Sequence, residues 1–553
     1  MTFLVVLVAL YMFGIGYLGF RGWRDTKNAA DYLIAGGDAH PAVMALSYGA
    51  TFISTSAIIG FGGAAAMFGM SLHWLTFLNI FVGVFVAFVF FGARTRAMGH
   101  HLQAHTFPEL LGKRFQSRAL QVFGGLLIVA FMPIYTASVL IGAANVVVAC
   151  FNVNYDAALL FFSIIVGFYV IMGGLKGVMY SDALQGAIMF FGLLIVLFLA
   201  YYQLGGFVAA HRALTDIAPL AVEKWGALGH QGWTAMPAFG SRFWWVVMSQ
   251  IAFGVGVGVL AQPQLAVRFM TVKSNRELNR AVLVGGLFIM VTVGVAYCVG
   301  PLSNLFFLSH PSRVDGHVFG ALSLVAANNE VDMIIPLFMR HFMPKWLCDV
   351  FFVTLLAAAM STVSSQFHAM GTAVSRDLYE TLCRRRGDDG SMVASRVGSL
   401  VIFVWSVLIA EALPKVMAGD GTAIIARGTA VFFGLCAAAF LPMYLGGLYS
   451  RRITRAGALW GGLCGFAASF FWLFFVKAKE SGDLRLCAAL TGKPCFAPDI
   501  QKWCPDWFLV AEVDPIVVGL PVAIVVTLAL SALTPGLPKA HLDDCFSGIA
   551  RRP

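Results

Sequence analysis

The sequence predicts an all-α membrane protein with about thirteen transmembrane helices, ten of them arranged as two sets of five in an inverted repeat. Two observations predict this fold class. Of the 553 residues, 59% are hydrophobic and 12% are charged, and no water-soluble domain needs so much apolar surface. Two hydrophobic stretches, 49–69 and 254–264, are rich in glycine, which weakens a continuous helix. Each opens one of two consecutive sets of five spans, a spacing typical of inverted repeats.

The expected spans comprise one extra helix before the two sets and two after them. The first span lacks the basic region and small-residue cleavage site of a signal peptide, so we expect a retained helix. Residues 1–41 precede the repeats, 42–203 and 204–448 form them, and 449–553 hold two final helices, an external loop and a short tail. The expected spans are 2–20, 42–68, 73–93, 119–149, 157–173, 182–203, 243–266, 281–306, 347–375, 397–414, 422–448, 457–476 and 515–533.

Lys and Arg residues predict the orientation in the membrane. If the N-terminus is outside, the basic loops 94–118, 267–280 and 376–396 are cytoplasmic, as the positive-inside rule requires. We therefore expect a multi-pass protein of the cell (inner) membrane with an external N-terminus and a cytoplasmic C-terminus. The net charge of +10 reflects these loops, so we expect lipid and not nucleic acid as a partner. We also expect the protein to function as a monomer.

Several function classes find no support in the sequence. There is no nucleophile–base pair and no metal-ligand spacing, which argues against an enzyme. The short C-terminal tail leaves no room for a signalling domain, and no filter-like loop suggests a channel. Cys487, Cys495 and Cys504 share one hydrophilic loop, where the sequence leaves open whether two of them form a disulfide.

A cluster of hydroxyl side chains stands out in the span 347–375. Ala358, Ser361, Thr362 and Ser365 share one helix face at positions i, i+3, i+4 and i+7. One interpretation is close helix packing, in which each hydroxyl bonds to its own helix. The other is a cation site, because hard cations prefer oxygen ligands. Interrupted spans at matching positions of two halves favour the second interpretation, since they indicate a secondary transporter with a site at the membrane midplane.

Several segments resemble a known family. The stretches GGLKGVMYSDALQGAIMFFG (173–192) and FLPMYLGGLYSRRITRAGALWGG (440–462) are similar to the two signatures of the sodium:solute symporter family. AQPQLAVRFMTVKS (261–274), ALSYGATFIST (45–55) and LAAAMSTVSSQ (356–366) resemble its sodium/proline and sodium/pantothenate branch. The resemblance covers nearly the whole chain. It implies a five-plus-five inverted-repeat fold, LeuT-like, with one extra N-terminal and two extra C-terminal helices.

The resemblance also implies where sodium binds. The family's main sodium site would use the backbone carbonyls of Ala50, Ile53 and Ala358 with the hydroxyls of Ser361 and Thr362. Neutral oxygens suit a monovalent ion that must bind and leave, whereas a divalent ion normally recruits carboxylates. A second sodium site, present in some members, corresponds to Asp182, Ser361, Ser364 and Ser365. Asp182 has a structural alternative, as a residue stabilised at the start of its helix.

The expected substrate site departs from that of the proline carriers. Phe52 stands where they have an Asp, and smaller residues replace their aromatic side chains. The loss of an ammonium partner suggests a small organic anion, a monocarboxylate or a pantothenate-like acid, held by half-helix N-termini and hydroxyls. The expected substrate-binding residues are Phe52, Ser54, Thr55, Ser56, Tyr135, Val255, Val259 and Gln262.

Together these patterns predict sodium-coupled import of a small organic solute by alternating access. The alternatives are a sodium/amino acid symporter of the proline type and a proton-coupled symporter of the same fold. In the proton-coupled case, His368 and Asp182 are the candidate proton carriers. Arg268 is expected to reach lipid phosphate or an acidic loop.

Overall fold

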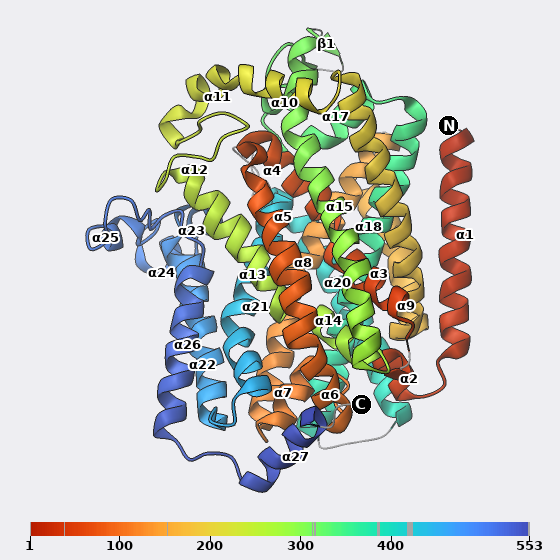
Figure 1. Cartoon of the computed structure of the whole chain (residues 1–553), viewed down its shortest axis with the longest axis vertical. Helices are drawn as coiled ribbons and strands as arrows, with labels where there is room; N and C mark the ends of the chain where they lie inside the picture. Colours follow the sequence, from red (N-terminus) through yellow and green to blue (C-terminus); the bar gives the residue numbers. More distant parts are fainter. Residues whose placement is uncertain are drawn as a thin grey trace.

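The computed structural model describes residues 2–37, 39–151, 153–311, 313–314, 317–383, 388–416 and 424–550. It is a bundle of long helices with the two chain termini at opposite ends (Figure 1). One end, here called the α11 end, carries α10 (Phe207–Asp216), α11 (Ala218–Trp225), η5 (Gly226–Leu228) and the two-residue strands β1 (Arg313–Val314) and β2 (His317–Val318). The opposite end, the α7 end, carries α6 (Ala93–His101), α7 (Phe107–Arg114) and α27 (Lys539–Ala550).

The all-α prediction is confirmed. In the part of the chain that the structure describes, the only strands are β1 and β2, which pair antiparallel with Arg313 opposite Val318. Eleven described stretches are long and apolar enough to cross a membrane. Thirteen were expected; among these eleven, Ser56–His101 is one apolar stretch that contains the expected span 73–93 and part of 42–68. The count of thirteen therefore stays a prediction.

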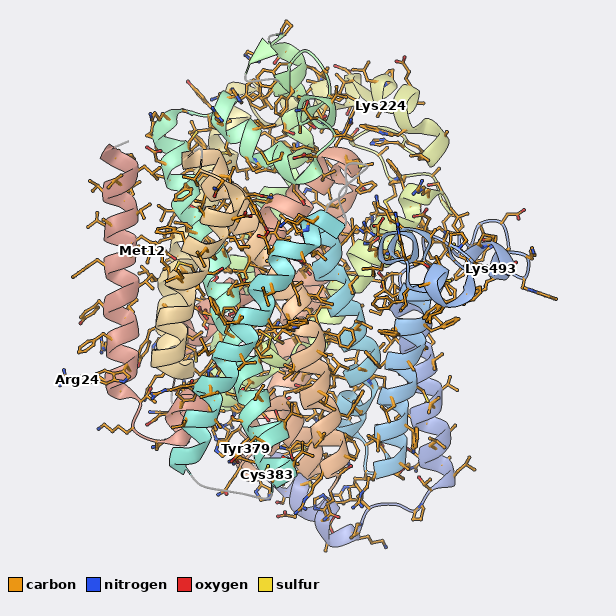
Figure 2. All side chains as sticks on the ribbon, turned by 180° about the vertical axis from the view of Figure 1, so that it is seen from behind. Met12, Arg24, Lys224, Tyr379, Cys383 and Lys493 are labelled. Atoms are coloured by element: carbon orange, nitrogen blue, oxygen red, sulfur yellow. The ribbon has the colours of Figure 1, made fainter. Side chains whose placement is uncertain are left out.

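The N-terminal helix lies at the edge of the bundle and packs on α9. It is mostly exposed on its outer face, as its apolar composition in a lipid environment requires (Figure 2). A short connection follows, in which the Asn28 side chain accepts a hydrogen bond from the Asp31 amide and caps the next helix. These elements are α1 (Thr2–Asp25), α2 (Ala29–Ile34) and η1 (Ala35–Gly37), where η marks 3-10 or π-helical segments.

The expected break in the span 42–68 is present. α3 ends at Phe52, Ile53 is extended, and a helix resumes at Ser56. A second break falls at Gly69, whose φ of +79° separates the two expected spans 42–68 and 73–93. The elements are α3 (Pro41–Phe52), η2 (Ser56–Gly60), α4 (Phe61–Phe68), η3 (Gly69–Leu72), α5 (His73–Ile80) and η4 (Phe81–Gly92), followed by α6 and α7.

The next two helices are long, α8 (Arg118–Phe151) and α9 (Tyr155–Gln203). The sequence analysis separates the spans 157–173 and 182–203 by a loop. The structure separates them at a single non-helical residue, Gly174 (φ +57°, ψ −167°), where two helical segments of α9 meet in a kink, so the connection is shorter than expected. A Cβ there would lie 2.6 Å from the ring of Tyr32 in α2, so glycine permits both the backbone angle and the close approach.

The Gly-rich stretch 254–264 is also broken as expected. It consists of short helical pieces that stop at Gln262, which is extended, and restart at Pro263. Proline is well suited to a first helical position because its missing N–H has no intrahelical acceptor there. The pieces are α12 (Arg242–Trp245), η6 (Val246–Val255), α13 (Gly256–Gly258), η7 (Val259–Ala261), α14 (Pro263–Ala266) and η8 (Val267–Thr271).

Of the eleven described apolar stretches, the hydroxyl-rich Lys345–Cys383 has the largest buried share: 89% of its apolar 18-residue segment lies inside the protein. It continues without a break through a π-helical segment toward the α7 end. The elements of this half are α15 (Asn275–Ser309), α16 (Ser323–Ala326), η9 (Val331–Met333), α17 (Ile334–Phe342), α18 (Lys345–Thr372), η10 (Ala373–Tyr379), α19 (Glu380–Cys383), α20 (Asp388–Val416) and α21 (Ile424–Tyr449).

The last two long helices, α22 and α26, pack tightly against each other. A Cβ on Gly461 would lie 1.9 Å from the Thr527 hydroxyl, so the approach depends on glycine. In the loop between these helices, Cys487, Cys495 and Cys504 are free thiols. The elements are α22 (Arg455–Phe471), η11 (Trp472–Val476), α23 (Ala478–Leu484), α24 (Leu486–Thr491), α25 (Ala497–Gln501) and α26 (Ile516–Leu533), then α27.

A cap covers the α11 end of the broken helix. Trp233 is fully buried, and its indole nitrogen donates to the Ala66 carbonyl at 2.7 Å. The Trp233 carbonyl accepts from the Met70 amide at 2.7 Å, and His230 bonds to the Met67 carbonyl at 2.9 Å. The connection 204–241 is therefore attached to the helical half that follows the break.

Candidate functional site

The break after α3 frees backbone groups inside the bundle. Ile53 has φ −91° and ψ 103°, so it leaves the helical ladder. The Ala57 amide, which would bond to the Ile53 carbonyl in a continuous α-helix, donates instead to the Ser54 carbonyl at 3.0 Å. The Ser56 amide donates to the Ser54 hydroxyl at 3.1 Å. Short polar side chains that compete for backbone partners thus support the break.

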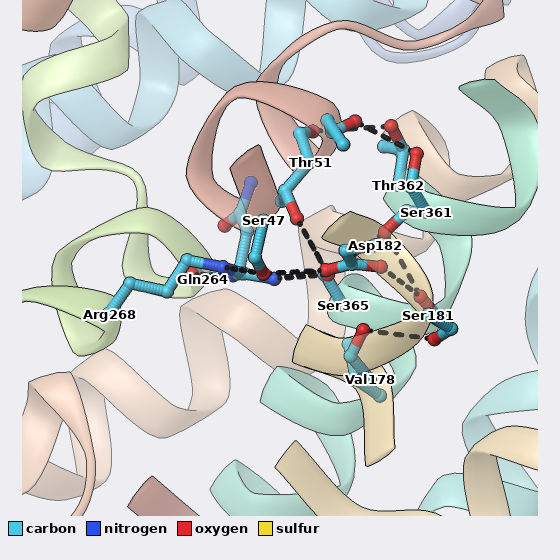
Figure 3. A network of polar contacts seen from close by, with 12 residues as sticks. Ser47, Thr51, Val178, Ser181, Asp182, Gln264, Arg268, Ser361, Thr362 and Ser365 are labelled. Carbon is cyan, nitrogen blue, oxygen red and sulfur yellow. Dashed lines mark hydrogen bonds and ion pairs between the residues drawn. The ribbon is translucent and has the colours of Figure 1, made fainter. Parts of the chain in front are cut away.

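The hydroxyls of α18 meet this break directly. Ser361 donates to the Ala50 carbonyl at 2.9 Å and also lies 3.1 Å from the Ala358 carbonyl. Thr362 donates to the Thr51 carbonyl at 3.2 Å (Figure 3). The structure therefore brings together Ala50, Ala358 and Ser361 of the predicted main sodium site. Thr362 lies next to this group and donates to the carbonyl of the following residue, Thr51. Ile53 is buried at the break. Whether sodium binds there stays a prediction.

Asp182 of α9 lies at the centre of a second polar cluster. Its carboxylate accepts from Ser47 at 2.8 Å and from Thr51 at 3.3 Å, both on α3. From α18, Ser364 donates at 3.4 Å and Ser365 at 3.3 Å. Of the four residues predicted for a second sodium site, Asp182, Ser364 and Ser365 are therefore in contact. Ser361 reaches the cluster through its backbone carbonyl, which accepts from both serines, while its hydroxyl bonds to Ala50.

The expectation for Arg268 is wrong. The side chain reaches neither lipid nor a loop, because Arg268 is completely buried. Its Nη2 lies 2.9 Å from Asp182 Oδ2 and also donates to Ser365, and its Nε donates to Ser47 at 3.0 Å (Figure 3). Arg268 thus links the restarted helix after Gln262 to α3, α9 and α18. A buried charge pair of this kind is stable only while both partners are present.

Arg268 provides the positive charge that a second sodium ion would bring to Asp182. The guanidinium donates hydrogen bonds to the side-chain oxygens of Asp182 and Ser365, two members of the predicted second site. The remaining candidate, His368, is buried and lies 3.4 Å from the Leu33 carbonyl, with its ring 5.5 Å from that of Tyr32. Among the described residues, no hydrogen bond or ion pair joins His368 to Asp182, so the two do not form a direct proton path here.

The predicted substrate residues lie on two sides of the break, and all are buried. On the first side, Thr55 donates to the Val139 carbonyl of α8 at 3.1 Å, and the buried Tyr135 hydroxyl lies near Ser54. The Ser56 hydroxyl is buried without a partner among the described residues. This side therefore presents hydroxyls and one aromatic ring.

The second side is apolar. A Cβ on Gly83 in η4 would lie 3.2 Å from Val259 and 3.8 Å from the Phe52 ring, so both side chains pack at this glycine. Val255 is buried in the same broken segment. Gln262 donates to the Gly258 carbonyl at 3.3 Å, which satisfies backbone freed by the break.

Sequence reasoning missed the contribution of α21. The Tyr135 ring lies 5.9 Å from that of Phe432, stacked, and 5.2 Å from that of Phe433, edge-on. The backbone of Phe433 also packs on Gly258. The adjacent phenylalanines are visible in the sequence of α21, but only the packing shows that they face Tyr135. The site thus retains aromatic surface, which the sequence analysis considered lost.

The sequence is similar to those of known proteins. The model of the sodium:solute symporter family matches residues 32–465. The osmoregulated proline transporter OpuE of Bacillus subtilis (strain 168) is 27% identical over 484 residues, which cover 87% of this chain and 90% of OpuE. The sodium/proline symporter of Escherichia coli (strain K12) is 28% identical over 494 residues, which cover 89% of this chain and 90% of that protein.

A solved structure shares the fold. It is that of a Na+-coupled sialic acid symporter in a substrate-bound outward-open state, described as revealing a novel Na+ site. The TM-score is 0.71 with 17% sequence identity, and the match covers 97% of this chain and 98% of that one. At this identity the likeness establishes the fold and leaves the solute open.

Proposed function

The chain belongs to the sodium:solute symporter family, and we propose that it imports a small amino acid of the proline type together with sodium, by alternating access. The family makes it a sodium-coupled secondary transporter of the membrane and not an enzyme. The observation that carries the proposal is the direct contact of the α18 hydroxyls with the carbonyls at the helix break, Ser361 with Ala50 and Thr362 with Thr51.

This contact supports a coupling mechanism. Sodium at the oxygens of Ala50, Ile53, Ala358, Ser361 and Thr362 would replace the direct hydroxyl–carbonyl bonds and fix the broken helix against α18. The hydroxyls of Ser54 and Thr55, which lie beside the break, would then be held in place for the solute. Coupling of this kind is reciprocal, because solute must tighten sodium binding by the same factor.

An amino acid would find a partner for each of its two charges, and apolar surface for its side chain, around the helix break. Its carboxylate would lie at the start of η2, where Ser54, Thr55 and Ser56 supply hydroxyls and a helix N-terminus supplies positive potential. Its ammonium would face the carbonyls that end η7 before Gln262, the negative end of a half-helix. Tyr135, with Phe432 and Phe433 behind it, offers apolar surface for a ring. Among the comparisons, the two curated relatives carry proline in their names, so they favour this alternative over an organic acid.

A monocarboxylate or pantothenate-like acid is the second candidate. The observation that favours it is Phe52, which packs at Gly83 where a carboxylate would otherwise partner an ammonium group. Asp182 cannot take that role while Arg268 holds it. The two candidates differ only in whether the solute carries a positive charge.

The remaining parts of the proposal are architectural. The two repeats would be 42–203 and 204–448, with 1–41 and 449–553 outside them. We place the N-terminus and the α11 end outside the cell and the α7 end in the cytoplasm, with the monomer as the transporting unit. Arg268 at Asp182 supports one sodium ion per cycle, at the main site.

Uptake into proteoliposomes tests the proposal. Radiolabelled L-proline, glycine, acetate, lactate and pantothenate are compared with an inward sodium gradient and with choline in its place, at constant pH. We expect sodium-dependent uptake of L-proline. A Ser361→Ala, Thr362→Ala variant should lose it, while Ser406→Ala, which removes a buried hydroxyl bonded only within α20, should retain it. Sodium-dependent uptake of an acid without L-proline uptake would establish the second candidate. Uptake that follows only a pH gradient would refute both.

A further inference from the structure

A cavity of about 370 Å³ lies at the α11 end, between the first turn of α1 and the start of α18. Leu4 of α1, Val146 of α8 and residues of α17 and α18 enclose it. Figure 1 shows the start of α1 and α17 at the same end of the bundle. The volume falls within the range of about 300–1,000 Å³ typical of small-molecule sites. None of the residues predicted for sodium or substrate lines it, so the cavity is separate from the central site.

The cavity lies next to membrane lipid. One of its walls is α1, a helix at the edge of the bundle that buries Leu4 and exposes residues such as Leu10 on its outer face. Seven residues after Leu4, the Tyr11 hydroxyl accepts a hydrogen bond from Gln185 at 2.9 Å and donates to Met360 at 3.2 Å. These bonds attach α1 to α9 and α18 about 10 Å further along the helix. The cavity therefore lies between this attachment and the α11 end.

Asp349 provides a buried carboxylate in this cavity. The residue is 9% exposed and lines the cavity wall. Among the described residues, no hydrogen bond or ion pair involves its side chain, and neither carboxylate oxygen is sealed from solvent. A carboxylate one turn inside a membrane helix needs a positively charged partner. A ligand that enters the cavity can supply that partner.

The rim of the cavity has the opposite charge. Lys345, the first residue of α18, and Arg340, near the end of α17, are exposed and line the cavity. Lys345 and Asp349 are four residues apart, so they share one helix face about 6 Å apart along the axis, yet they form no ion pair. No side chain caps α18, and its first amides add positive potential at Lys345. The cavity therefore has positive charge at its rim and a carboxylate one turn deeper.

The remaining wall of the cavity is apolar. It includes Val146 from α8, Met339 and Met343 from α17, and Phe352 and Leu355 from α18. Such surface favours a ligand that carries hydrocarbon next to its charged groups. A small inorganic ion would leave this wall in contact with water. An anionic lipid would match the rim but would leave the carboxylate without a donor.

We propose that this cavity binds the headgroup of a phospholipid that carries a primary ammonium group, such as phosphatidylethanolamine. The ammonium donates to Asp349, the phosphate lies at Lys345 and the start of α18, and the first part of the acyl chains lies on the apolar wall. Phosphatidylcholine has the same net charge, but its quaternary ammonium has no N–H to donate, so the site distinguishes the two lipids. The inference does not depend on which solute is transported.

Native mass spectrometry of the purified, full-length protein in detergent tests the inference. Delipidated protein is titrated with phosphatidylethanolamine, phosphatidylcholine and phosphatidylglycerol that have identical acyl chains. We expect the Kd of the first bound phosphatidylethanolamine to be at least fivefold lower than that of either other lipid. Asp349→Asn should remove the preference over phosphatidylcholine, and Lys345→Gln should weaken the binding of both zwitterionic lipids. Asp349 has no protein partner to lose, so its variant should fold normally, which an unchanged Tm would verify.

Two charge-matched controls lie at the same end of the bundle, outside the cavity lining. Asp216→Asn and Lys224→Gln each remove an exposed charge, and Lys224 is far from α1 (Figure 2). Both should bind lipid as the unaltered protein does. Equal affinity of the unaltered protein for phosphatidylethanolamine and phosphatidylcholine, or a preference that persists in Asp349→Asn, would overturn the proposal.

Two further outcomes would replace the proposed ligand. Tightest binding of phosphatidylglycerol, lost in Lys345→Gln, would overturn the proposal in favour of an anionic-lipid site. Soluble phosphoethanolamine has the same two charged groups without acyl chains, so we expect it to displace the lipid only in large excess. Displacement at equimolar concentration would show that the cavity takes a soluble compound and would overturn the assignment to a lipid. Failure of the proposed transport function appears separately, as absent sodium-dependent uptake of L-proline.

Discussion

The buried pair of Asp182 and Arg268 allows a quantitative test of how the centre is held together. We consider Asp182→Asn, Arg268→Gln and the double variant. Both side chains are fully buried, and the guanidinium links the restarted helix to α3, α9 and α18. Each single change leaves one charge inside the bundle without its partner, whereas the double change removes both.

The expected magnitudes follow from that difference. Breaking a buried pair by removing one partner costs about 3–5 kcal/mol, because the other charge stays desolvated. Replacing both by neutral groups of similar shape costs far less, since Asn and Gln can still bond to Ser47 and Ser365. We therefore expect each single variant to lose about 3–5 kcal/mol and the double variant less than either. The coupling energy should exceed about 3 kcal/mol.

The assay is denaturant unfolding in detergent micelles, repeated in sodium and in choline. In Arg268→Gln the carboxylate of Asp182 lacks a cation, so sodium should stabilise this variant more than the unaltered protein. The extra stabilisation is about 1.4 kcal/mol when sodium is tenfold above its dissociation constant. Arg452→Gln controls for the loss of one positive charge. Losses that simply add in the double variant, or an absence of extra sodium stabilisation, would refute the reasoning.

Three further predictions concern other parts of the molecule. Tyr135→Phe removes a buried hydroxyl at the proposed solute site and should raise the KM for solute uptake about 2- to 12-fold, the loss expected for one hydrogen bond to the solute of about 0.5–1.5 kcal/mol; an unchanged KM would place Tyr135 outside the solute site. Burial raises the pKa of Asp514, before α26, to about 7, so the folded protein keeps a proton that the unfolded chain releases near pH 4. Stability should therefore fall as pH rises from about 4 to 7, and Asp514→Asn should flatten that slope in Tm measurements; an equally steep slope would contradict the assignment. Gly69→Ala should destabilise the protein by about 1–3 kcal/mol, because φ is +79° and the new Cβ would lie 2.4 Å from the Trp233 carbonyl oxygen; a Tm equal to that of the unaltered protein would contradict it.

Local composition predicted the features that depend on local physics. Gly49, Ser54 and Gly60 weaken the helix in the span 42–68, and the break falls among them. The hydroxyl face of Ser361 and Thr362 follows from helical periodicity alone, and these residues meet the break as the resemblance implied.

Sequence reasoning failed where the outcome depends on which distant segments meet. Arg268 follows a helix break near a basic loop, and its neighbours alone give no sign that it is buried. Asp182 could have indicated the burial of Arg268, because a carboxylate within a membrane span needs a positively charged partner. Near Gly174 the sequence predicts a break between two spans, and the structure has a kink at that glycine, but the helix resumes directly after it and not at residue 182.

In the proposed transport cycle, the cap at the α11 end would allow the turnover rate to change without a change in solute selectivity. Trp233 is bonded to Ala66, on the half-helix that would move in the proposed alternating-access cycle, and to Met70 just beyond it. In that cycle the connection 204–241 would travel with the half-helix or detach from it at each turnover. Substitutions within the connection can lengthen or shorten the closed interval while leaving the solute contacts intact, so turnover number and solute affinity are free to diverge between related proteins.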